Sequence, residues 1–181
     1  MPRNVAFNPD LLEKFLGRWA GPVTTWFQPG TDPMHDQMTG VIERVVEGRS
    51  IVHRYDTSVG GKPARGQLMI GRSLETMNVC LAWIDSFHTG GDQMILQGDG
   101  KALKNGFSAF GAYAAPQGPP WGWRTTYRAK SADGLEILHY NILPSGEEML
   151  AVKIEYARQA AKKAAAPGTP PRARSRSARR A

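Results

Sequence analysis

The sequence contains little cysteine and no long apolar run, and these absences exclude some classes of protein. Cys80 is the single cysteine among 181 residues, which excludes an intrachain disulfide and suits a reducing compartment. No stretch approaches the roughly 20 apolar residues of a membrane-spanning helix. The N-terminal segment MPRNVAFNPD also lacks the apolar core of a signal peptide. We therefore expect a soluble, cytoplasmic protein without a membrane span.

Familiar catalytic signatures are also absent. The chain has no Gly-x-Ser-x-Gly elbow, no His-Glu-x-x-His, no Cys-x-x-Cys pair and no glycine-rich phosphate or dinucleotide loop. Cys80 falls within a predicted strand without an adjacent histidine, so we expect it to act as a small core hydrophobe. We expect the same role, filling gaps in the core, for the strand methionines Met38, Met69, Met77, Met94 and Met149.

The formal net charge of +7 is confined to the end of the chain. Residues 1–158 contain 16 basic and 16 acidic residues, whereas residues 159–181 carry seven basic residues and no acidic one. The terminal segment is rich in Ala, Pro, Arg and Ser and lacks large apolar side chains, so we predict a disordered basic tail. It would bind anionic partners weakly, and we expect no specific nucleic-acid binding. The predicted domain is residues 1–158.

Secondary-structure signals predict one helix followed by strands. Asn8 suits the N-cap and Pro9 the first helical turn, an apolar face runs to Leu16, and Gly17 suits the end of the helix. Gly-containing turns such as Gly60-Gly61 then separate runs rich in Val, Ile, Thr and aromatic residues. These runs predict ten strands, near residues 18–27, 38–47, 50–57, 64–72, 76–85, 93–98, 103–113, 121–129, 135–143 and 148–158.

Ten short strands joined by hairpins favour an all-β fold. We predict an antiparallel up-and-down barrel with a short N-terminal helix, because closure removes exposed strand edges. A two-sheet sandwich is the alternative.

The segment after the predicted helix reads Gly17-Arg18-Trp19-Ala20-Gly21. Its Gly-x-Trp pattern resembles the start of calycin barrels, the fold of lipocalins and fatty-acid-binding proteins. In calycins the tryptophan plugs one end of the barrel and stacks on a basic side chain near the end of the last strand. The resemblance implies this structural role for Trp19, with Arg158 as its cation–π partner.

Five segments together carry a wider resemblance: Phe15–Trp19, Trp83–His88, Trp121–Thr125, the Asn-Ile-x-Pro-x-Gly-Glu-Glu run at 141–148, and Glu155–Arg158. They make the chain similar to the domain-of-unknown-function 1579 family of bacterial lipocalin-like proteins. The likeness spans about residues 8–158, and the family has no settled activity, so the resemblance implies a fold and leaves the function open.

The densest group of side chains suited to ligand binding comprises Trp83, Asp85, His88, Trp121, Trp123 and Arg124. Trp83 and Asp85 share one strand face, and the carboxylate could orient the imidazole of His88, which follows in the turn. The guanidinium of Arg124 suits a carboxylate or phosphate of a ligand, with the tryptophans as apolar walls. The structural alternative is an internal Asp85–Arg124 salt bridge with the tryptophans in the core.

His139 lies in the penultimate predicted strand, where it alternates with Ile137 and Asn141. Apolar residues occupy both faces of this strand, so two interpretations stay open. His139 is either a ligand-binding residue in a cavity or a buried histidine whose hydrogen bonds are satisfied within the protein.

Four hypotheses for the function follow from these residues. The first is a binding barrel that encloses a small, largely apolar ligand with an anionic end. The second is a haem-binding barrel similar to nitrobindin, with His139 or His88 as axial ligand. The third is an enzyme that uses Asp85 and His88 as an acid–base pair. The fourth is a structural or tail-mediated interaction protein whose barrel is packed solid. The sequence assigns no cofactor.

Overall fold

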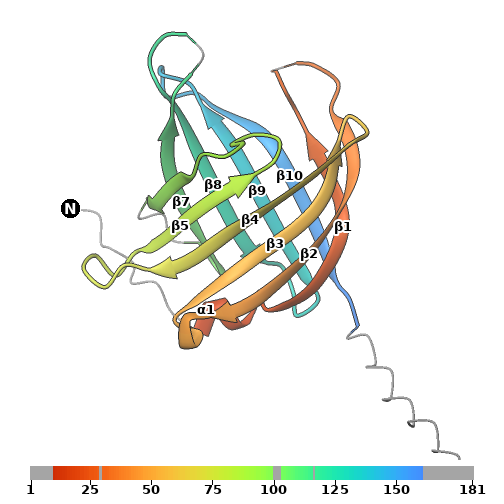
Figure 1. The fold of residues 1–181 in the computed structure, drawn as a ribbon, viewed down its shortest axis with the longest axis vertical. Helices are drawn as coiled ribbons and strands as arrows, with labels where there is room; N and C mark the ends of the chain where they lie inside the picture. The colour runs from red at the N-terminus through yellow and green to blue at the C-terminus, as the bar shows by residue number, and fades with distance from the viewer. Residues whose placement is uncertain (1–9, 29, 100–102, 116, 161–181) are drawn as a thin grey trace, which may run out of the picture.

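The ten predicted strands form a closed antiparallel barrel in the computed structural model, which describes residues 10–28, 30–99, 103–115 and 117–160 (Figure 1). Each strand pairs with its neighbours in sequence, and the first pairs with the last. The helix α1 (Asp10–Glu13) precedes the barrel, and the 3-10 turn η1 (Val46–Gly48) joins the second and third strands. The strands are β1 (Gly17–Thr25), β2 (Met34–Val45), β3 (Ser50–Val59), β4 (Lys62–Arg72), β5 (Val79–Asp85), β6 (Met94–Gly98), β7 (Gly106–Tyr113), β8 (Trp121–Ala129), β9 (Gly134–Ile142) and β10 (Glu148–Arg158).

The predicted up-and-down barrel is confirmed, and the sandwich alternative is wrong. The strand boundaries differ most at β5, which begins at Val79 and not at residue 76. Met77 has a φ of 59° and donates its backbone N–H to the Ser73 carbonyl, so it belongs to the preceding turn. The predicted N-cap residue Asn8 and nearly all of the predicted tail, from residue 161 on, lie outside the described residues.

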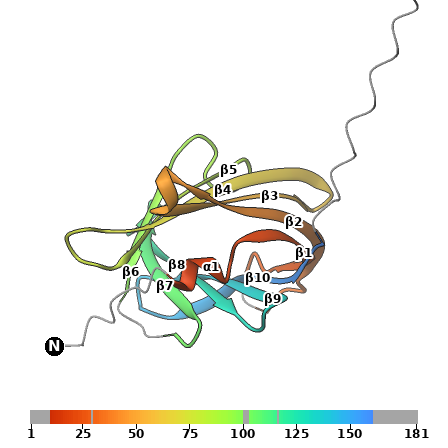
Figure 2. The same ribbon diagram turned by 90° about the horizontal axis from the view of Figure 1, so that it is seen from below.

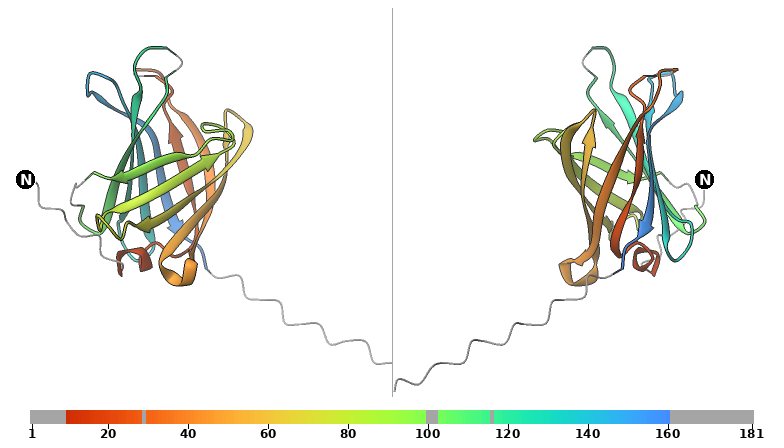
Figure 3. Two further views of the ribbon diagram at one scale, coloured as in Figure 1. Left: turned by 60° about the vertical axis from the view of Figure 1, so that its left-hand side comes forward. Right: turned by 90° about the vertical axis from the view of Figure 1, so that its right-hand side faces the viewer.

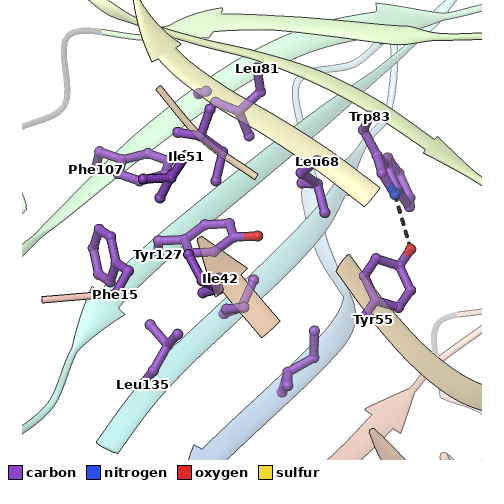
Figure 4. Close-up of a cluster of buried hydrophobic side chains, with 14 of the residues drawn as sticks. Phe15, Ile42, Ile51, Tyr55, Leu68, Leu81, Trp83, Phe107, Tyr127 and Leu135 are labelled. Atoms are coloured by element: carbon purple, nitrogen blue, oxygen red, sulfur yellow. Dashed lines mark hydrogen bonds between the residues drawn. The ribbon is translucent and has the colours of Figure 1, made fainter. Parts of the chain in front are cut away.

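The N-terminal segment that the structure describes, residues 10–16, lies across one end of the barrel (Figures 2 and 3). The helix α1 ends at Glu13, earlier than predicted. The next three residues continue with tighter i→i+3 bonds, in which the amides of Lys14, Phe15 and Leu16 donate to carbonyls three residues earlier. The ring of Phe15 is fully buried against Phe107 and Tyr127, with both ring centroids 5.8 Å away. This segment therefore closes the end of the barrel with apolar side chains (Figure 4).

Alternation along the strands decides which side chains enter the core. Val79 and Leu81 are buried, so Cys80 between them lies on the outer face and is half-buried. The prediction that Cys80 is a core residue is wrong for this reason. Met38 and Met94 are buried as predicted, whereas Met69 and Met77 are exposed and Met149 is half-buried. Within the described ranges, no helix has the length and apolar character needed to cross a membrane.

Candidate ligand-binding cavity

A cavity of about 220 Å³ lies inside the barrel. Its wall includes the ends of β1, β3 and β5 that are farthest from α1, so it opens at the end of the barrel opposite the helix (Figure 1). Apolar side chains such as Val23, Leu68 and Ile154 line it together with a group of aromatic rings. An apolar protein cavity of about 150 Å³ is enough to bind benzene. The cavity therefore has room for about one or two rings.

Four rings from three strands and one loop form a stack at the cavity wall. Trp83 of β5 and Trp123 of β8 lie 5.4 Å apart with an interplanar angle of 22°. His139 of β9 stacks on both, at 5.6 Å and 5.5 Å, and His88 of the β5–β6 loop does so at 5.3 Å and 4.8 Å. Both tryptophans and His139 are buried, whereas His88 is exposed at the mouth. The stack gives the cavity a flat aromatic wall.

The inward face of β8 supplies a hydrogen bond that orients His139. Thr125 is fully buried, and its Oγ1 lies 2.9 Å from Nδ1 of His139. Burial, and to a smaller extent the nearby His53 and His88, lower the pKa of His139 to about 3. His139 is therefore neutral at pH 7, and its ring carries one N–H.

A second buried histidine forms a network with two tyrosines. Nδ1 of His53 lies 2.8 Å from the Tyr127 hydroxyl, and Nε2 lies 3.2 Å from the Tyr156 hydroxyl. Burial lowers the pKa of His53 to about 3 and raises the pKa of both tyrosines, so all three groups are neutral. A Cβ at Gly40 would lie 2.6 Å from Nε2 of His53, so the absent side chain makes space for this network. In either tautomer of His53, one hydroxyl has a proton left to donate.

Asp85 binds the backbone of the loop that follows it. Its Oδ1 accepts the backbone N–H groups of Phe87, His88 and Thr89 at 3.1, 2.5 and 3.0 Å. Its Oδ2 accepts the Tyr55 hydroxyl at 3.0 Å, and Tyr55 in turn accepts the indole N–H of Trp83 at 3.0 Å (Figure 4).

These bonds bear on the predicted acid–base pair. Asp85 contacts the backbone of His88, and no hydrogen bond joins its carboxylate to the His88 ring within the described residues. Burial lowers the pKa of His88, partly offset by the charge of Asp85. The carboxylate therefore holds the loop in place, and the geometry of a side-chain acid–base dyad is not formed.

Arg124 lies outside the cavity, contrary to the prediction. Strand residues alternate, so Arg124 points to the outer face while Trp123 and Thr125 point inward. Its Nε is 2.9 Å from Oδ2 of Asp99, and Nη1 pairs with Glu148. The predicted Asp85–Arg124 salt bridge is wrong for the same reason. Trp121, half-exposed at the start of β8, also lies outside the cavity wall.

The structure thus brings together Trp83, Asp85, His88, Trp123 and His139 of the predicted site residues. Sequence reasoning missed the polar partners Tyr55, Tyr127 and Thr125. Two of these were detectable, because the period of two places Thr125 and Tyr127 on the same face as Trp123. Among the described residues that line the cavity there is no lysine or arginine. At its mouth, the half-exposed rings of Phe27 and Phe87 lie 6.0 Å apart.

Comparisons with known proteins agree with the fold. The solved structure of an S-type phycobiliprotein lyase from Guillardia theta is similar, with a TM-score of 0.54 and 10% sequence identity over 84% of this chain and 93% of that chain. At this identity the likeness concerns the fold alone. No curated protein matches the chain. A family model described as a protein of unknown function (DUF1579) matches residues 8–158, which include all ten strands and every residue of the cavity wall. The chain therefore belongs to the DUF1579 family.

Proposed function

We propose that the protein binds a small, largely apolar molecule inside the barrel. The observation that carries the proposal is the cavity of about 220 Å³, with the buried rings of Trp83 and Trp123 in its wall. Mostly apolar concave sites with a few polar groups are typical of small-molecule binding. A flat ligand gains contact with the two indole faces, because offset stacking of aromatic rings is favourable. An anionic end of the ligand was predicted because Arg124 was expected in the cavity. Arg124 is on the outer face, so nothing in the described cavity wall now supports that part of the prediction.

Native mass spectrometry of freshly purified protein tests whether the cavity retains a molecule. A retained molecule with the mass of a one- or two-ring compound supports the proposal. An absorption band of haem would instead support the alternative in which His139 or His88 binds iron.

Titration with naphthalene tests the cavity directly, with quenching of tryptophan emission as the readout. Ala64 is buried and lines the cavity, so Ala64→Leu fills part of its volume and should weaken binding at least about tenfold. Ala82→Leu is the matched control, because Ala82 lies on the outer face between buried neighbours of β5. Circular dichroism checks that both variants fold. Equal naphthalene binding by the two folded variants would contradict the proposal.

A further inference from the structure

We propose that the ligand is an uncharged, flat molecule with a hydrogen-bond acceptor, and that the imidazole Nε2–H of His139 donates to this acceptor. The inference rests on the proposed function and specifies the chemical class of the ligand.

Thr125 determines which nitrogen of His139 carries the proton. The Thr125 hydroxyl is fully buried, and Nδ1 of His139, at 2.9 Å, is its one hydrogen-bond partner among the described residues. A buried hydroxyl proton without an acceptor is costly, so Thr125 donates to Nδ1. The neutral ring must then carry its proton on Nε2. No side chain or carbonyl in the described part of the protein accepts from Nε2, and His139 lines the cavity.

Trp123 supplies a second donor without a partner. Its side chain lines the cavity and is 3% exposed, and its indole Nε1–H is buried with no acceptor among the described residues. The ring lies 5.5 Å from His139. Trp83, its neighbour in the stack, differs in that its N–H is bonded to Tyr55. Protein atoms enclose the Trp123 N–H, so the ligand oxygen or ring nitrogen is assigned to Nε2–H of His139 and not to Trp123.

The charges around the cavity favour an uncharged ligand. An anion would meet no lysine or arginine among the described lining residues, and both buried histidines are neutral. A cation would meet Asp85, but the two oxygens of this carboxylate already accept four hydrogen bonds. Burying an unpaired charge is far more costly than burying a neutral acceptor that is hydrogen-bonded.

Three two-ring probes of similar size test the inference: naphthalene, which has no acceptor, coumarin, which has a carbonyl, and 2-naphthoate, which is charged. We expect coumarin to bind about tenfold more tightly than naphthalene, the effect of one net hydrogen bond. We expect 2-naphthoate to bind more weakly than either. His139→Phe keeps a flat ring but removes the Nε2–H donor, so it should abolish the preference for coumarin over naphthalene. Tyr140→Phe, on the outer face of the same strand, should keep it.

Nitrogen NMR of the wild-type protein gives an independent readout that does not depend on any variant folding. It should show His139 as the Nε2–H tautomer, and a proton on Nδ1 would overturn the assignment of the donor. Equal affinity for coumarin and naphthalene, or tight binding of 2-naphthoate, would overturn the inference while leaving the proposed function intact. Failure of all three probes to bind would instead count against the proposed function.

Discussion

The guanidinium of Arg158 lies over the indole of Trp19, 4.2 Å from the ring centroid, where β1 and β10 close the barrel. The same guanidinium donates to the carbonyls of Leu16 and Lys14, and the Trp19 indole N–H donates to Phe15 at 2.8 Å. Gly17 lies between these groups with a φ of 131° and leaves no room for a Cβ beside Arg158. The pair therefore connects residues 14–16 to the place where β1 and β10 close the barrel.

Substitutions at this pair should show coupled losses of stability. Trp19→Ala should lower the free energy of unfolding by about 3–5 kcal/mol, as expected for a large buried aromatic. Arg158→Ala should cost less, and the double variant should lose about 0.5–1 kcal/mol less than the sum of the two. Urea denaturation of all four proteins gives the coupling energy, and full additivity would disprove the stacking contribution.

Arg124→Leu should destabilise the barrel without altering the cavity. The side chains of Arg124 and Asp99 are 12% and 11% exposed, so the change removes the cationic partner of a largely buried carboxylate. We expect a loss of about 1–3 kcal/mol. Asp99→Asn should partly restore stability, whereas Asp85→Asn should not, since Asp85 is bonded elsewhere. Naphthalene affinity should stay unchanged, and a large fall in it would place Arg124 at the site after all.

Asp85→Ala should loosen the β5–β6 loop, because it removes the acceptor of three backbone N–H groups. The expected cost is about 2–4 kcal/mol, with faster amide exchange at residues 87–89. Asp85→Asn keeps one carbonyl oxygen and should cost less. If the two substitutions were equivalent in both stability and exchange, the capping role of Oδ1 would be excluded.

Stability should fall in mild acid because of the two buried histidines. Both have a pKa of about 3 in the folded state, below the ordinary value of about 6.5. The unfolded chain therefore binds more protons between these values, so this stability is complete above pH 6.5 and is lost as pH falls toward 3. Each histidine contributes a slope of up to about 1.4 kcal/mol per pH unit.

The control for this pH dependence is a substitution that removes no titratable group. His139→Gln should remove about 1.4 kcal/mol per pH unit from the slope of unfolding free energy between pH 6 and pH 4. Leu138→Gln, on the outer face of the same strand, should leave the slope unchanged. Urea titrations at several pH values measure both, and identical slopes for the two variants would refute the assignment.

The sequence alone determined the fold and its closure. Turn residues separate runs whose side chains alternate, and each hairpin brings neighbouring strands together, so the barrel follows from local signals. The Trp19–Arg158 contact was expected from the resemblance to calycin barrels, and the structure contains it. The same alternation predicts that Arg124 and Trp123 lie on opposite faces of their strand. Grouping residues by closeness in sequence, without regard to the strand face, caused that error.

Only the tertiary structure decided which inward side chains meet. His53 reaches Tyr127 and Tyr156 across 74 and 103 residues of chain, and Tyr55 reaches Asp85 across 30. These contacts depend on the stagger of the strands around the barrel, which a two-residue period does not specify. Whether the interior is hollow depends likewise on the summed volumes of side chains from all strands. Alternation therefore predicts which face a residue occupies, and closure of the barrel determines its partners.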